Sequence, residues 1–191
     1  RSRANDSVNA ANPVVIGNQV FCSAAYYGVG SFLLDIAEDG KQFTEVWSTN
    51  ERRKKNRRLD PAVEIHWTTP ILHDGHLYAF SGRNEPDAQF RCVELKTGRV
   101  KWSRDERWRA YSSKQPNVYG RGSTIMADGK LFVLGEGGLL GLFEVNVAKP
   151  VELGRHQVPE FHYPCWAAPI LSDKRMVIRS EDYMICFDVA K

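Results

Sequence analysis

No stretch of the chain approaches the roughly 18 consecutive apolar residues that a membrane-spanning helix needs, although 42% of its 191 residues are hydrophobic. The first residues, Arg1, Ser2 and Arg3, include neither an initiator Met nor the apolar run of a signal peptide. We therefore expect a soluble chain with no membrane span, processed or cut from a longer protein.

Cysteine is scarce, and its spacing matches no familiar cysteine site. The sequence has no C-x-x-C motif and no vicinal pair, which argues against a zinc knuckle and a redox dithiol. Most of the cysteines lie in apolar runs typical of strands. We expect all four to be small buried hydrophobic residues rather than disulfide partners or metal ligands: Cys22, Cys92, Cys165 and Cys186.

Excess charge of one sign is also small, at +3 from 26 basic and 23 acidic residues. Six of the basic residues fall within residues 52–58, so the rest of the chain carries 20 − 23 = −3. This run could attract nucleic acid or anionic lipid, but no aromatic residue is interleaved in it for base stacking. We interpret it as a solvated loop and expect no nucleic-acid partner.

Helical periodicity is missing, and an internal repeat is present instead. No convincing segment of ten or more residues has apolar side chains at 3.6-residue spacing, which indicates an all-β chain. A pattern of short apolar strand, two-residue turn and second apolar strand recurs four times. Its copies are residues 13–21, 70–78, 124–132 and 169–177.

The turns and the segments that follow them complete a four-stranded unit. Asp74-Gly75 and Asp128-Gly129 are strong signals for tight hairpins, because these residue types tolerate positive φ. A third strand, a glycine turn and a fourth strand follow in residues 90–102 and, more loosely, in residues 32–47. The third copy keeps its third strand but has no Trp, and the fourth copy ends within the pattern.

Repeats of four strands predict a β-propeller of four-stranded antiparallel blades. A single sheet has two apolar faces and cannot bury both alone, so blades stack around an axis. A β-sandwich would explain the strands but not the repeat. We expect one partial propeller domain over residues 1–191, with about four blades near residues 12–48, 69–103, 123–154 and 168–191.

Residues 92–102 resemble the A-x-D-x-x-T-G-x-x-x-W docking motif of quinoprotein-type propellers. Thr97, Gly98 and Trp102 match it, whereas Cys92 and Glu94 replace the small residue and the acid. The resemblance implies that Trp102 is buried against the backbone of a neighbouring blade near a glycine. The looser copy that ends at Trp47 implies the same for that side chain.

More widely, the chain resembles the carboxy-terminal half of PQQ-binding-like β-propeller repeat proteins of planctomycete-type bacteria. The segments that carry the resemblance are residues 9–15, 24–30, 69–75 and 165–171. The resemblance implies a ring of seven or eight blades, upstream blades that are missing here, and a periplasmic or otherwise extracytoplasmic location. Propellers of this type include both dehydrogenases and noncatalytic lipoproteins, so the fold alone leaves the function open.

An incomplete ring is the structural consequence. The fourth unit ends where its outermost strand should begin, and residues 1–8 are too polar to supply that strand. We expect an open arc of four sheets with two uncovered faces, in which residues 1–8 do not pair with the strand at residues 183–188.

The function we expect is a noncatalytic binding or scaffold module for a protein, peptide or glycan, with no cofactor. The alternative is a fragment of a PQQ-dependent alcohol dehydrogenase, which would need calcium beside the quinone and an Asp base. The sequence has no vicinal cysteine pair, and neither a base nor a calcium ligand can be matched to a motif. We therefore assign no catalytic residue.

Candidate ligand contacts lie where the chain enters the repeats. Trp67 and Trp166 each stand three residues before the proline that opens a repeat, which places them near the mouth of a central channel. With His66 and Arg179 they form our candidate binding set. The alternative is that these side chains only pack the loops between blades.

Two groups of residues that contain histidine are candidate metal sites. His73 and His76 flank the Asp74-Gly75 turn, where a hairpin makes them cross-strand neighbours, but two ligands without a third bind metal weakly. His156, His162 and Cys165 fit no metal-site spacing. We expect no metal at either group.

Overall fold

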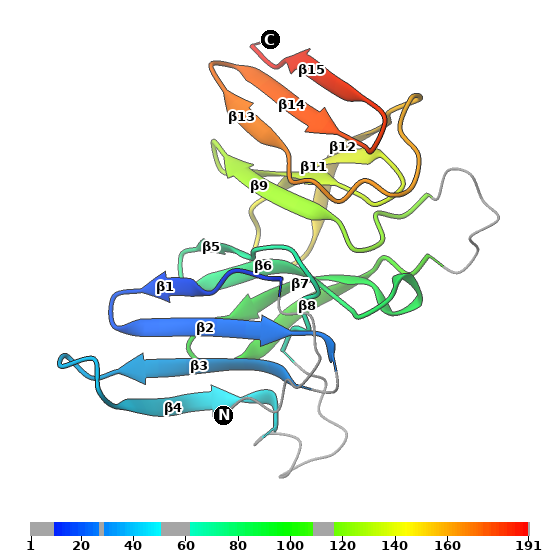
Figure 1. The fold of residues 1–191 in the computed structure, drawn as a ribbon. Helices are drawn as coiled ribbons and strands as arrows, with labels where there is room; N and C mark the ends of the chain where they lie inside the picture. The colour runs from blue at the N-terminus through cyan, green and yellow to red at the C-terminus, as the bar shows by residue number, and fades with distance from the viewer. Residues whose placement is uncertain (1–9, 27–28, 51–61, 109–116, 191) are drawn as a thin grey trace.

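The computed structural model describes residues 10–26, 29–50, 62–108 and 117–190, and this part is nearly all β (Figure 1). Within these residues no helix combines the length and hydrophobicity needed to cross a bilayer. The strands are β1 Val14–Ile16, β2 Gln19–Ala24, β3 Gly30–Ile36, β4 Phe43–Ser48, β5 Ile71–His73, β6 His76–Ser81, β7 Gln89–Glu94, β8 Arg99–Asp105, β9 Ser123–Ala127, β10 Lys130–Leu134, β11 Leu139–Glu144, β12 Val151–Gln157, β13 Ile170–Ser172, β14 Arg175–Arg179 and β15 Met184–Asp188.

The strands form four antiparallel sheets, each a meander in chain order. Blade 1 is β1-β2-β3-β4, blade 2 is β5-β6-β7-β8, blade 3 is β9-β10-β11-β12, and blade 4 is β13-β14-β15. The blades follow one another from the bottom to the top of Figure 1. This arrangement confirms the predicted all-β propeller architecture. Blade 4 has three strands in the described part of the chain, and residues 1–8 lie outside it.

Tight turns between the first two strands of each blade explain why the repeat forms hairpins. Asp74 and Gly75 have φ of 45° and 70°, so both central residues of that turn are in the left-handed region. Asp173 and Lys174 reach 49° and 60° although neither is a glycine. The turn pairs His73 with His76 across the strands.

Successive side chains of a strand point to opposite faces of the sheet, and runs of apolar residues therefore give each blade two apolar faces. Leu77, Leu131 and Met176 hold the same register position in blades 2, 3 and 4, and each packs toward the preceding blade with no more than 2% of its surface exposed. Their neighbours in sequence, such as Tyr78, pack toward the following blade. We call these surfaces the preceding face and the following face of a blade.

Two tryptophans fasten successive blades. Trp47 of blade 1 donates from Nε1 to the Leu95 carbonyl of blade 2 over 2.8 Å. Its ring lies against Gly98, where a Cβ atom would stand 2.8 Å from the indole. Trp102 of blade 2 donates in the same way to the Asn146 carbonyl of blade 3 over 2.8 Å. Both indoles are buried, with 8% and 9% of their surface exposed.

A β-bulge lies beside each of these tryptophans, and we call the residue at this point of the fourth strand the docking position. Pairing shifts by one residue between Leu33 and Leu34 beside Trp47, and between Cys92 and Val93 beside Trp102. Blade 3 has the same shift, but the residue paired with Leu142 there is Gly154. The interface between blades 3 and 4 therefore forms without a tryptophan from the fourth strand of blade 3, around an apolar core: Leu134, Val158, Phe161, Cys165, Met176 and Ile178.

Thr97 shapes the turn that receives Trp47. Its hydroxyl donates to a carboxylate oxygen of Glu94 and accepts the N–H of Arg99 over 3.2 Å. Gly98 then takes a φ of 65°, which a residue with a side chain rarely adopts. The turn formed by Thr97 and Gly98 therefore presents a flat backbone surface on which the Trp47 indole packs.

The expectation that all four cysteines are buried is wrong in part. Cys92 and Cys165 are buried, but Cys22 is half-buried and Cys186 is exposed, and all four are free thiols. Cys22 lies on the preceding face of blade 1 and Cys186 on the following face of blade 4. These two are accessible because no sheet in the described part of the chain covers either face.

We predict that Trp102→Ala lowers the free energy of unfolding by about 3–5 kcal/mol, because it leaves a large cavity between blades 2 and 3. Lys101→Ala, on the exposed neighbouring position of β8, should change it by less than about 0.5 kcal/mol. Urea denaturation followed by circular dichroism measures both. Equal stability of the two variants would refute the docking role of Trp102.

We also predict that Gly98→Ala destabilises the chain more than Gly40→Ala. Both residues have φ near +65° and pay the same backbone strain of about 1–2 kcal/mol. Only at Gly98 would the added methyl meet the Trp47 ring, whereas nothing lies within 4 Å at Gly40. The difference in urea midpoint therefore reports the close approach of Trp47, and similar midpoints would contradict it.

Candidate functional site

Three successive blades present a large side chain at the same point of the loop that leads into their first strand. Trp67, Arg121 and Trp166 each stand four residues before register-equivalent isoleucines of β5, β9 and β13. We call the surface that these lead-in loops form, together with the side chains that contact it, the rim.

A buried ion pair lies at the centre of the rim. Arg121 donates from Nε to Oε1 of Glu136 over 3.0 Å and from Nη2 to Oε2 over 2.8 Å, and its backbone N–H donates to Oε1 over 2.7 Å. The side chains are 7% and 0% exposed. Gly120 permits this approach, because a Cβ atom there would stand 2.9 Å from Oε1 of Glu136. Burial raises the pKa of Glu136, and the hydrogen bonds from Arg121 oppose that rise.

The ion pair fixes both predicted tryptophans. Trp166 donates from Nε1 to Oε2 of Glu136 over 3.1 Å. The Arg121 guanidinium carbon lies 4.6 Å from the centre of the Trp67 ring, a cation–π contact. The rings of Trp67 and Trp166 lie 5.7 Å apart. Trp67, which leads into blade 2, and Trp166, which leads into blade 4, are thus both held by contacts with the Arg121–Glu136 ion pair.

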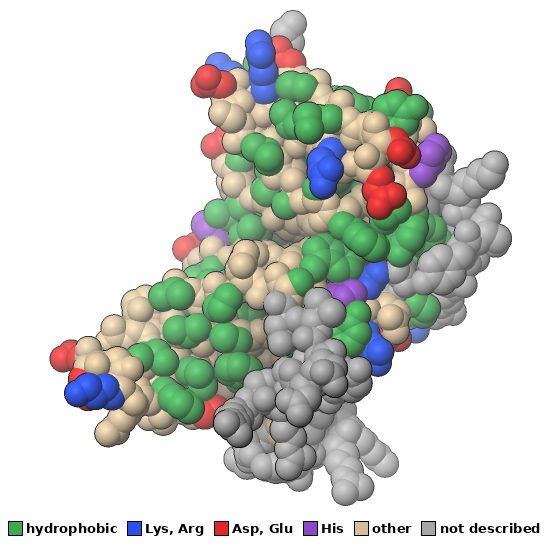
Figure 2. All heavy atoms as spheres, in the orientation of Figure 1, with side chains coloured by type: hydrophobic (Ala, Val, Ile, Leu, Met, Phe, Trp, Pro, Cys, Tyr) green, Lys and Arg blue, Asp and Glu red, His purple; other side chains and the backbone are tan. Residues whose placement is uncertain are grey.

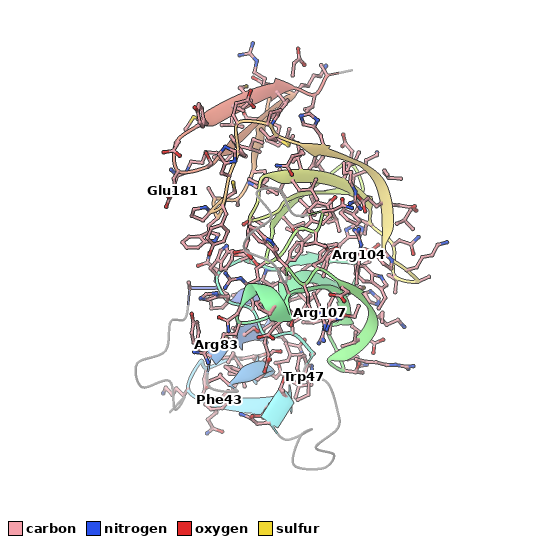
Figure 3. The ribbon with its side chains drawn as sticks, turned by 90° about the vertical axis from the view of Figure 1, so that its right-hand side faces the viewer. Phe43, Trp47, Arg83, Arg104, Arg107 and Glu181 are labelled. Atoms are coloured by element: carbon pink, nitrogen blue, oxygen red, sulfur yellow. The ribbon has the colours of Figure 1, made fainter. Side chains whose placement is uncertain are left out.

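His66 joins the rim to blade 1. Its Nδ1 lies 2.6 Å from Nη1 of Arg121, and its Nε2 lies 2.8 Å from the Tyr26 hydroxyl. A guanidinium can only donate, so Nδ1 accepts and the ring proton of neutral His66 sits on Nε2. The Arg83 guanidinium covers the Tyr26 ring at 4.8 Å. Figure 3 shows Arg83 of blade 2 on the same side of the stack as Glu181 of blade 4.

An aromatic corner forms the accessible part of the rim. Trp166 and Tyr163 meet edge to face with centroids 6.0 Å apart, and 47% and 39% of their surface is exposed. Trp108 backs the Tyr163 ring at 5.4 Å and is buried. Large aromatic side chains in such a setting can stack on a sugar ring, a peptide side chain or another aromatic group.

The structure brings together three of the four predicted contact residues. His66, Trp67 and Trp166 form a continuous chain of ring contacts. Arg179 ends β14 and is exposed, and no hydrogen bond or ring contact between it and those three occurs in the described part of the chain. Whether these residues bind a ligand stays a prediction.

Sequence reasoning missed Arg121, Glu136 and Tyr26. Arg121 has the same offset as the two tryptophans, so aligning the third repeat through its lead-in loop would have found it. Glu136 and Tyr26 follow the second strands of blades 3 and 1, and the glycines near each of them do not reveal its partners. Their role depends on contacts between blades.

The other groups examined as sites have simpler partners. His73 lies 3.3 Å from its neighbour Asp74, and His76 contacts the Asp74 carbonyl. Among the described residues no three His, Cys, Asp or Glu side chains are placed to hold a metal ion. Cys165 donates to the His162 carbonyl, and burial raises its pKa to about 12. The basic run at residues 52–58 lies outside the described residues.

A second buried polar cluster lies between blades 2 and 3. The Arg104 side chain of β8 pairs with Glu152 of β12 at 2.7 Å, and Tyr119 donates from its hydroxyl to the same carboxylate over 2.9 Å. Burial raises the pKa of Glu152, but hydrogen bonds from Arg155 and Tyr119 outweigh this and lower it overall. Glu106 is fully buried beside Arg104. These contacts cross-link two blades.

Comparison with known proteins identifies the fold. No family model and no curated protein matches the sequence. Among solved structures, BamB from Moraxella catarrhalis superposes with a TM-score of 0.61 and 10% identity, over 97% of this chain and 48% of that chain. The computationally designed Ika4 protein superposes with a TM-score of 0.60 and 12% identity, over 100% of this chain and 96% of that chain.

These similarities, together with the stacked meanders, show that the chain has the β-propeller fold. It spans about half the length of BamB and nearly the full length of Ika4. At this level of identity the likeness concerns the fold alone.

We predict that Glu136→Gln lowers the free energy of unfolding by about 3–5 kcal/mol, because it leaves the Arg121 charge buried without a counter-charge. The double variant Arg121→Met with Glu136→Leu removes both charges and should recover much of that loss. Urea denaturation followed by circular dichroism measures the stability of each variant. A single variant as stable as the parent would show that the ion pair does not support the rim.

Proposed function

We propose that the chain is a noncatalytic β-propeller binding or scaffold module, and that its rim contacts a protein, peptide or glycan. Trp166 and Tyr163 supply the contact surface, with His66 and Trp67 beside them. Arg179 at the end of β14 is a further candidate contact, and Arg121 and Glu136 position the rings.

The observation that carries this proposal is that the Trp166 indole is hydrogen-bonded to the buried Glu136 while nearly half of its surface is exposed. Its indole N–H is anchored on Glu136, whose other contacts fix the carboxylate in the core. An aromatic side chain fixed before binding loses little conformational entropy when a ligand stacks on it. A tryptophan serving only to pack loops would be expected to bury most of its surface.

The occupied polar atoms favour binding over catalysis. Arg121 donates to Nδ1 of His66, so this nitrogen has no free lone pair with which to accept a substrate proton. Both oxygens of Glu136 accept hydrogen bonds from Arg121 or Trp166. For the same reason the rim does not fit calcium and PQQ, since its one buried carboxylate has no oxygen left for a cation.

We further propose an extracytoplasmic location and membership of the PQQ-binding-like propeller group. Support comes from the docking motif around Thr97, Gly98 and Trp102, and from the blade-to-blade hydrogen bonds that Trp47 and Trp102 make.

Binding can be tested by selecting ligands without assuming their class. The chain would be probed with a phage-displayed random dodecapeptide library and with a printed glycan array. We predict that Trp166→Ala weakens the selected ligands at least about tenfold, as loss of a central aromatic contact usually does. Leu153→Ala, which is equally exposed on β12, is the matched control.

Two outcomes would contradict the proposal. Ligands that bind the parent and Trp166→Ala equally well would place recognition elsewhere. Dye-linked alcohol oxidation after addition of PQQ and Ca²⁺, lost on heating, would favour the dehydrogenase alternative.

A further inference from the structure

No sheet in the described part of the chain covers the preceding face of blade 1, which is apolar. Val15, Val20 and Leu34 lie side by side on its preceding face. The residues of blade 2 in the register positions of Val20 and Leu34 are Leu77 and Val93, both 0% exposed because blade 1 covers them. In blade 1 Val15 is 69% exposed. Figure 2 shows hydrophobic side chains gathered over the sheet of β1–β4.

Blade 4 presents the complementary uncovered surface. Ile170, Val177 and Cys186 lie side by side on its following face. Their register equivalents in blade 2 are Ile71, Tyr78 and Cys92, which pack against blade 3. In blade 4 Ile170 is 63% exposed, and Met184 on the same face is 71% exposed.

We propose that a second copy of this chain covers both surfaces, with blade 4 of each copy packed on blade 1 of the other. All three interfaces within the chain join a following face to a preceding face. The described residues leave one unmatched surface of each kind, so a contact between copies continues the same interface. Two such contacts related by a twofold axis close a ring of eight blades, within the range known for propellers.

The contact between copies does not require a docking tryptophan. Blade 3 has Gly154 at the docking position and still packs on blade 4 through an apolar core, with further hydrogen bonds to the loop that leads into blade 4. Blade 4, with three described strands, can pack on blade 1 in the same manner. Ika4, which this chain matches over 96% of its length, shows that a protein of this size can have the same fold.

Sedimentation equilibrium of the chain from about 1 to about 100 µM tests the proposal, since micromolar affinity is detected in this range. We expect a mass twice the 21.7 kDa of one chain. Val15→Glu on blade 1 and Ile170→Lys on blade 4 should each weaken association at least about a hundredfold, because each buries an unpaired charge. Both side chains are largely exposed in the single copy, so folding is preserved. Lys41→Glu, in the exposed turn before β4, is the control.

An equimolar mixture of Val15→Glu and Ile170→Lys separates this arrangement from others. The Val15→Glu copy keeps an intact blade 4 and the Ile170→Lys copy keeps an intact blade 1, so the mixture should associate again through one unaltered contact. If either variant alone remained a full dimer, the contact would join like faces, which overturns the proposal. A parent chain that stays monomeric, or that forms a ladder of larger masses, also overturns it and leaves the two surfaces for sheets of another polypeptide or of further chain.

Discussion

Burial of both faces of each sheet against neighbouring sheets is the constraint on which the rest of the structure depends. A four-stranded meander has little stability alone, because its apolar side chains point to both sides. Leu77 and Tyr78 are adjacent in sequence yet belong to two different cores, one shared with blade 1 and one shared with blade 3. Strand β6 of blade 2 is thus stabilised by contacts to two other blades at once.

The rim follows from the same stacking. The lead-in loops bring Trp67, Arg121 and Trp166 together only because blades 2, 3 and 4 lie side by side. An ion pair as deeply buried as Arg121–Glu136 is costly to desolvate, and its value lies in fixing one arrangement of the side chains around it. The ion pair lies where the three lead-in loops meet. Its contacts with Trp67 and Trp166 orient both indole rings.

Much of the fold could be predicted from the sequence because its signals are local. Turn residues such as Asp74 and Gly75 mark the hairpins, alternation marks the strands, and the Thr97-Gly98 turn with Trp102 marks a docking strand. The candidate site could be predicted only in part. The tryptophans stand out beside the repeat-opening prolines. Glu136 is flanked by glycines, but that pattern does not reveal Trp166, a partner from another blade. The apolar run around Cys186 predicts that its side chain is buried, but such a run cannot show whether a neighbouring sheet covers that face.

Gly154 has a consequence for how the stack moves. The first two interfaces combine an apolar core with a tryptophan of the fourth strand that is hydrogen-bonded to the next blade. The third interface lacks that tryptophan, and its hydrogen bonds come from the loop that leads into blade 4. Cooperative units with fewer cross-links open at lower free energy, and their amide hydrogens exchange with solvent sooner. We therefore expect amide hydrogens beside Gly154, where the docking tryptophan is missing, to exchange sooner than those beside Trp47 and Trp102. A partner that holds blade 4 in place would slow exchange there most, so the distribution of exchange rates along the stack records where the chain is engaged.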